Sequence, residues 1–244
     1  MRACILLGMV ASARADVAPP VTFAPSVVGK LVPSPPVAGD YAMSLAMSFE
    51  EFVTTELRID ERVRGVLRLT LAADGSARAC LGSHASHVSE GQYHYEPDPA
   101  KRQRHASEEL RLVALRGHWQ VTGTVATLRF DESSWGSCDL AKAQKSEAAV
   151  ELRCVGVGTG DRLPAGSLVC EATERSELFG LGMPMGEANH NQSRRRMPPA
   201  GRHVLLGAPG LMIDVRQGSH DARPTFTFRA GAVTLVERDY QPRK

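Results

Sequence analysis

Apolar side chains recur at every second position over much of the chain after residue 39. In the first such segment Tyr41, Met43 and Leu45 lie on one side, and small residues lie on the other. These small residues are Ala42, Ser44, Ala46 and Ser48. A period of two is the repeat of a strand with one buried face, so a strand is predicted. A helix from Leu45 to Phe52 is the competing interpretation.

Further segments with the same period are separated by turn residues. They lie at 67–71, 76–82, 109–115, 118–122, 124–130, 149–155, 167–172, 203–206, 211–216, 225–228 and 233–236. Asp74-Gly75 is a strong hairpin signal, and the turn sequences Gly207-Ala208-Pro209-Gly210 and Ala230-Gly231 predict two more hairpins. Many short strands with few helical stretches predict an all-β fold, either an antiparallel lipocalin-like barrel or a β-sandwich.

The N-terminal region differs from the rest of the chain. Arg2 precedes a short apolar core, and Ala13-Arg14-Ala15 has the small-x-small form of a cleavage site, so 1–15 is predicted to be a signal peptide. Residues 16–38 are rich in proline, which predicts an extended linker. A single β domain is expected over 39–240, with a subdivision near 178–200 left open. A soluble periplasmic or extracellular product is expected, unless the signal is kept as an anchor.

The charge balance changes if the signal is removed. The whole chain has a formal net charge of +2, but loss of Arg2 and Arg14 leaves 27 basic and 27 acidic side chains. A general attraction to nucleic acid is therefore not expected. Outside the signal no apolar run approaches the roughly 20 residues of a membrane helix, so no membrane span is expected.

Four cysteines remain after the signal, and in an oxidising compartment they predict two disulfides. Cys154 and Cys170 each share a strand face with apolar neighbours, whereas Cys80 lies on the face opposite Ala79 and Leu81. We therefore favour Cys154 paired with Cys170, and Cys80 paired with Cys138. Free, buried thiols are the alternative.

Two polar segments interrupt the pattern, at 83–107 and 178–200, and both are predicted to be long loops. The first contains His84, His87 and His94. His-x-x-His can place two imidazoles on one zinc or copper ion, so these three histidines are the candidate metal ligands. A solvated loop without metal is the interpretation we favour, and no cofactor is expected.

Signatures of catalysis are weak. Ser137 lies in Trp-Gly-Ser-Cys, not in a Gly-x-Ser-x-Gly elbow, and His-Glu-x-x-His and the dinucleotide fingerprint are absent. The basic run Arg194 to Arg196 stands in the second polar segment and is typical of a solvated loop tip. A catalytic role is therefore uncertain and not favoured.

The order of features between residues 39 and 130 resembles small lipocalin-like barrels of bacterial cell-envelope proteins. The resemblance rests on Gly39-Asp40-Tyr41, on Leu-x-Leu before Ala-Asp-Gly-Ser at 69–76, and on Gly117-His118-Trp119. In lipocalins proper Gly-x-Trp lies on the first strand, whereas here it is in the middle of the chain. The resemblance implies a barrel, and no binding residue is carried over from it.

These observations favour an exported, non-catalytic β domain that acts as a binding or envelope-associated module, with a small ligand or an envelope partner. The alternative is a metal-dependent enzyme or metal-binding protein that uses the histidines of 83–107. A purely structural domain without a ligand is the third hypothesis.

Overall fold

The computed structural model describes residues 28–54, 57–91, 104–172, 202–217, 225–231 and 235–241, and this part of the chain is all-β. The strands are β1 (Leu31–Ser34), β2 (Gly39–Thr54), β3 (Leu57–Leu71), β4 (Ser76–Gly91), β5 (Arg104–Thr122), β6 (Val125–Trp135), β7 (Gln144–Gly160), β8 (Leu168–Ala172), β9 (Arg202–Leu206), β10 (Leu211–Gln217) and β11 (Thr225–Ala230). Two short 3-10 helices, η2 (Leu140–Lys142) and η5 (Glu237–Tyr240), complete the described elements.

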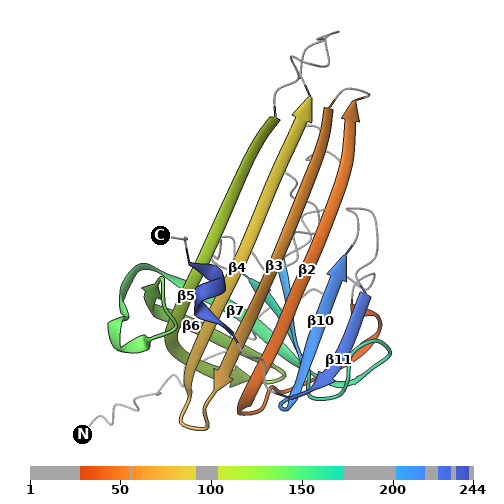
Figure 1. Ribbon diagram of the computed structural model, residues 1–244. Coiled ribbons are helices and arrows are strands. Elements are labelled where there is room, and N and C mark those ends of the chain that lie inside the picture. The colour runs from red at the N-terminus through yellow and green to blue at the C-terminus, as the bar shows by residue number, and fades with distance from the viewer. Residues whose placement is uncertain are drawn as a thin grey trace, which may run out of the picture.

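The strands form one strongly curled sheet with the shape of a half-barrel (Figure 1). Its order is β11-β10-β2-β3-β4-β5-β6-β7-β8-β9, and β1 pairs with β7 beside this path. All neighbouring pairs are antiparallel except β10 and β2, which run parallel. Consecutive strands from β2 to β8 are sheet neighbours, as expected for a chain of hairpins.

The apolar side of the alternating pattern fills the inside of the curl. Tyr41, Met43 and Leu45 of β2 are nearly inaccessible to solvent, as predicted for a strand with one buried face. They pack in one cluster with Leu67 of β3 and Phe130 of β6. The helix considered for 45–52 is wrong, because β2 continues to Thr54.

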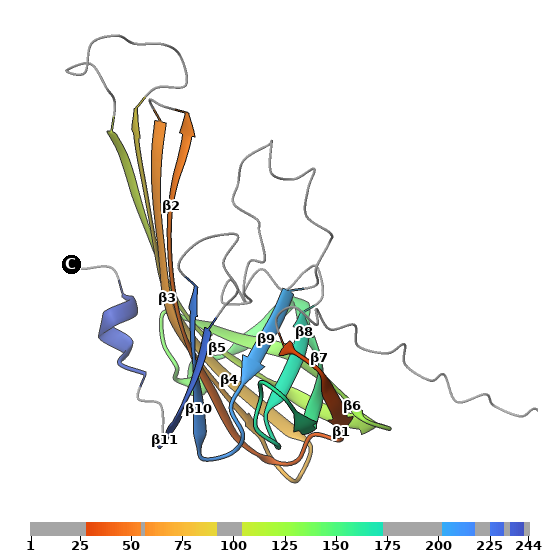
Figure 2. The same cartoon turned by 90° about the vertical axis from the view of Figure 1, so that its right-hand side faces the viewer.

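Strands β2 to β5 extend well beyond the rest of the sheet as a four-stranded arm (Figure 2). The predicted loop at 83–107 is wrong over much of its length, since β4 reaches Gly91 and β5 begins at Arg104. The apolar period fades here because Ser and His occupy both faces of β4. Pairing with β3 nevertheless continues to the Leu57↔Gly91 position, because ladder hydrogen bonds join backbone groups and need no apolar side chain.

The expected linker at 16–38 is also ordered at its C-terminal end. Leu31–Ser34 forms β1, Val28 is 1% exposed, and the register with β7 shifts between Val32 and Pro33. Proline lacks a backbone N–H, so strands tolerate it at edges and bulges such as this one. The proline-rich segment is therefore partly a strand. Residues 1–27, with the predicted signal, lie outside the described residues.

Two predicted hairpins near the C-terminus are wrong. β9 and β10 do not pair with each other, because β9 pairs with β8, and β10 pairs with β2. Between them the Gly207 N–H donates to the Ala42 carbonyl at 3.0 Å, so the chain crosses from one end of the sheet to the other. β11 pairs with β10, and 235–236 is not a strand, while 233–234 lies outside the described residues. The second predicted loop, 178–200, lies outside the described residues.

The four cysteines form two pairs, Cys154 with Cys170 and Cys80 with Cys138. These are the pairs that strand alternation favours. Cys154 and Cys170 are directly opposite on β7 and β8, with Cα atoms 4.0 Å apart, and both are fully buried. Cys80 lies on the outer face of β4 and joins it to Cys138 in the loop before η2, with Cα atoms 5.6 Å apart.

The described C-terminal residues pack on the outer face of β4. The Tyr240 ring of η5 lies against Gly82, where an added Cβ would come within 2.6 Å of it. The same segment contacts the Cys138 loop, since the Cys138 N–H donates to Glu237 and Gln241 Nε2 donates to the Gly136 carbonyl, both at 3.0 Å. Because Gly82 has no side chain, the Tyr240 ring packs directly against the backbone of β4 at this position.

Candidate functional site

A hollow of about 610 Å³ lies on the outer face of the sheet, where β2, β10 and β11 are neighbours. Its lining residues are Ser44, Ala46, Asp214, Val215, Arg216, Thr227 and Arg229. Alternation places all of them except Val215 on the outward side of their strands, opposite the core residues Leu45 and Ile213. Five of the seven lining residues are polar or charged, because the apolar face of each strand packs in the core.

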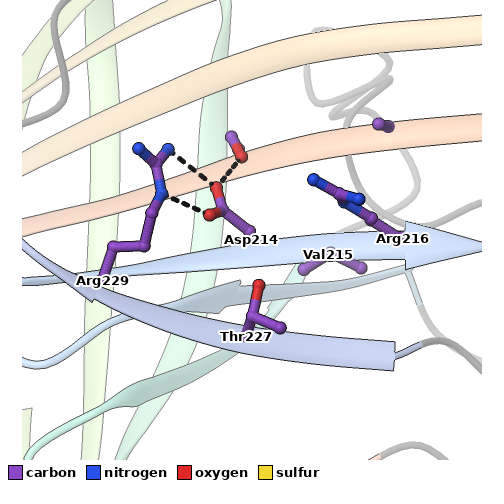
Figure 3. Close-up of a pocket in the computed structure, with 7 residues that line it drawn as sticks. Asp214, Val215, Arg216, Thr227 and Arg229 are labelled. Carbon is purple, nitrogen blue, oxygen red and sulfur yellow. Dashed lines mark hydrogen bonds and ion pairs between the residues drawn. The ribbon is translucent and has the colours of Figure 1, made fainter.

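Asp214 is at the centre of this hollow and is held by two other residues (Figure 3). Arg229 on β11 donates from Nε to Oδ2 and from Nη2 to Oδ1, the second at 3.1 Å, so the contact is bidentate. The Ser44 hydroxyl on β2 also donates to Oδ1. Ser44 and Asp214 are register partners in the parallel β2 and β10 pair, which places these side chains in contact.

The charge state of Asp214 follows from competing effects. Burial raises the pKa of its carboxyl, but the hydrogen bonds from Arg229 and Ser44, with the charges of Arg229 and Arg216, outweigh burial and hold that pKa below its usual value. The hydrogen bond to Asp214 in turn raises the pKa of Arg229. Asp214 is therefore a carboxylate at neutral pH and has no proton to give as an acid.

Arg216 is the second cation of the hollow. In Figure 3 it lies on the side of Asp214 opposite Arg229. Its guanidinium makes no hydrogen bond to another side chain in the described ranges, whereas Arg229 is bound to Asp214. Two guanidinium groups and one carboxylate leave one positive charge, together with the hydroxyls of Ser44 and Thr227. Such a set of donors binds an anionic group by charge-assisted hydrogen bonds.

The histidines proposed as metal ligands do not meet in the described structure. His84 and His87 both lie on β4, three residues apart, and therefore on opposite faces of the sheet. Within the described ranges no three His, Cys, Asp or Glu side chains gather as metal ligands. His94 lies outside the described residues.

His84 is instead part of the outer face of the arm. Its Nε2 is 3.8 Å from Glu108 Oε2, too far for a hydrogen bond, and this buried nitrogen has no other partner among the described residues. On β3 its register partner is Arg64. His84 therefore faces Glu108 across the β4 and β5 pair. It cannot bind the same metal ion as His87, because the two side chains lie on opposite faces of β4.

Sequence reasoning did not single out Ser44, Asp214, Arg216 or Arg229. Their outward positions follow from the alternation on β2 and β10, so a polar outer face was predictable. Their proximity was not, because it depends on the parallel pairing of β10 with β2 and on β11 pairing back on β10. Both pairings join segments far apart in sequence.

Two further findings bear on the class of protein. Among the described residues no helix is long and apolar enough to cross a membrane. No model of a known protein family matches the chain, and neither the curated proteins nor the solved structures contain a significant match.

Proposed function

We propose that this protein is an exported, non-catalytic binding module, and that the hollow over β2, β10 and β11 holds an anionic group of its ligand. The observation that carries the proposal is the arrangement of Arg216 and Arg229 on either side of Asp214 within one hollow. The two cysteine pairs support export, because disulfides persist in oxidising compartments.

The composition of the hollow supports binding over catalysis. Its one carboxylate is ionised and already accepts three hydrogen bonds, so it is poorly placed to act as a general acid or base. No histidine or cysteine lines the hollow. Arginine and hydroxyl donors with no histidine beside them to activate a hydroxyl are typical of a site that recognises an anion.

Titration calorimetry with inorganic phosphate and with sulfate tests the proposal. We expect one weak site per chain, with an affinity that decreases as salt is added, because the hollow is open to solvent. Arg216→Gln removes one charge-assisted hydrogen bond of about 1.5 kcal/mol, so it is expected to weaken binding about tenfold.

A matched control is Arg238→Gln, since Arg238 of η5 is also a surface arginine, with 87% of its side chain exposed. It lies outside the hollow, and we expect it to leave phosphate binding unchanged. The proposal fails if wild-type protein binds neither anion, or if the two variants weaken binding equally.

A further inference from the structure

The hollow is one part of a longer feature on the outer face, which we call the β2 trough. Its floor is the outward face of β2. The residues on this face between positions 42 and 48 are all small, namely Ala42, Ser44, Ala46 and Ser48. Four outward positions at two-residue steps span about 20 Å along a strand. Beside Ala42, Ser44 and Ala46 the outward positions of both neighbouring strands carry larger side chains: Met212, Asp214 and Arg216 on β10, and Arg68, Val66 and Arg64 on β3.

Arginines line both sides of the β2 trough in register. On one side, Arg216 of β10 is the partner of Ala46, and on the other side the partner of Ala46 is Arg64 of β3. The backbones of β10 and β3 are two strand spacings apart, about 10 Å.

The outward row at Ala42 also ends in two arginines, but one of them is on β11, one strand further from β2. Arg229 of β11 is the partner of Met212, Met212 is the partner of Ala42, and Ala42 is the partner of Arg68 on β3. Arginines thus stand at both ends of two parallel rows, with Asp214 and Ser44 in the row between them.

Two of the four arginines on β3, Arg64 and Arg68, have no assigned structural role. Arg64 and Arg68 are exposed, and neither makes a hydrogen bond or an ion pair with other residues in the described part of the chain. Among the nearby acidic groups, Asp60 pairs with Arg62, whereas Asp40 accepts a hydrogen bond from the neutral Thr70 hydroxyl at 2.6 Å and keeps its charge. The four arginines of the trough therefore exceed its two carboxylates, those of Asp40 and Asp214, although the chain as a whole is close to neutral.

We infer that the β2 trough binds a linear polyanion, a flexible chain that carries closely spaced anionic groups. This inference rests on the proposed function, because the hollow at Arg216 and Arg229 holds one of those groups. Arg64 and Arg68 then bind neighbouring groups on the other side of the trough. The small floor residues allow the chain to approach the backbone of β2.

The chemistry of the trough also separates this ligand from a nucleic acid. Single-stranded nucleic acid is bound by basic grooves in which bases stack on aromatic rings. The described residues of the trough are arginine, alanine, serine, threonine, aspartate, valine and methionine, with no aromatic ring among them. Recognition is therefore of charge along a chain, and the anions can be phosphates or carboxylates.

The test compares linear polyphosphate and polyglutamate with inorganic phosphate, each titrated into the full chain by calorimetry. At least one of the two polymers is expected to bind about tenfold or more tightly than phosphate, since additional arginines contact one chain. Its affinity should decrease more steeply with salt. Arg64→Ser is expected to reduce that salt slope by about one while leaving phosphate binding in the hollow unchanged.

A second variant tests the floor without removing charge. Ser48 is exposed and does not line the hollow, so Ser48→Trp obstructs the trough and is expected to weaken only polymer binding. Gln120→Trp, at an exposed position of β5, is the matched control and should have no effect.

The outcomes distinguish this inference from the proposed function. Phosphate binding without tighter polymer binding overturns the polyanion inference and leaves the proposed function intact. If the protein binds neither phosphate nor either of the two polymers, both the polyanion inference and the proposed function are wrong. If vesicles with anionic headgroups bind in an Arg64-dependent manner and the soluble polymers do not, the surface recognises a membrane and the inference is wrong. Tight binding of one polymer alone supports it and identifies the anion.

Discussion

At the scale of single residues, Asp214 is the group on which the hollow depends. Its side chain is 12% exposed, and its charge is offset by Arg229, which is 62% exposed and therefore well solvated. A carboxylate that is nearly buried stabilises the fold only while its partners remain. The register that joins Ser44 to Asp214 thus links the stability of β10 to that of β2.

Asp214→Asn is expected to lower the free energy of unfolding by about 1–2 kcal/mol at neutral pH, because a charged hydrogen bond to Arg229 is lost. The folded-state pKa of Asp214 is below its unfolded value of about 3.9, so its contribution is complete above that value. It decreases as the pH falls through the folded-state pKa. Urea denaturation of both proteins across this acidic range is the measurement.

Asp60→Asn is the control for that comparison, since Asp60 forms an exposed pair with Arg62 and should contribute less than about 0.5 kcal/mol. If the wild-type protein and Asp214→Asn differ equally at neutral and acidic pH, the stabilisation does not come from the carboxylate charge.

At the scale of secondary-structure elements, the sequence predicted strands better than it predicted their ends and partners. The alternation of Leu67, Leu69 and Leu71 identified β3 where one face is buried. It did not identify the arm, because β4 carries polar residues on both faces there. In the arm β4 is a strand because it pairs with β3 and β5, which its own sequence does not indicate. Pairing across long separations, as in β10 with β2, left no local signal in the sequence.

The short helix η5 provides a test of how one element is seated on another. Burial raises the pKa of Tyr240, and the charge of Asp239 raises it further. Gly82→Val places a side chain where the ring lies, so Tyr240 is expected to move into solvent. Its pKa should then fall towards the ordinary value of about 10, as followed by ultraviolet titration.

Tyr240→Phe identifies which step of the titration belongs to this residue, because the variant keeps the ring and loses the ionising hydroxyl. An unchanged Tyr240 titration in Gly82→Val would show that the glycine does not seat the helix.

At the scale of the whole molecule, the curled sheet separates two kinds of surface. The inner side is filled by the apolar half of each strand and forms the core. The outer side over β10, β2 and β3 presents the other half, where small residues on β2 lie between arginines. The all-β class and the small face of β2 were predictable from alternation. The trough was not, because it requires β10, β2 and β3 to be neighbours in this order.

Hydrogen exchange with and without the tighter-binding polymer, polyphosphate or polyglutamate, tests the central claim most directly, because it reports where on the sheet the ligand lies. Slower exchange is expected in 42–48 of β2, in β10 and in the adjoining part of β3. The outer end of the arm in β4 and β5 should be unchanged. Protection confined to the arm, or uniform across the sheet, would contradict the assignment of the β2 trough as the binding surface.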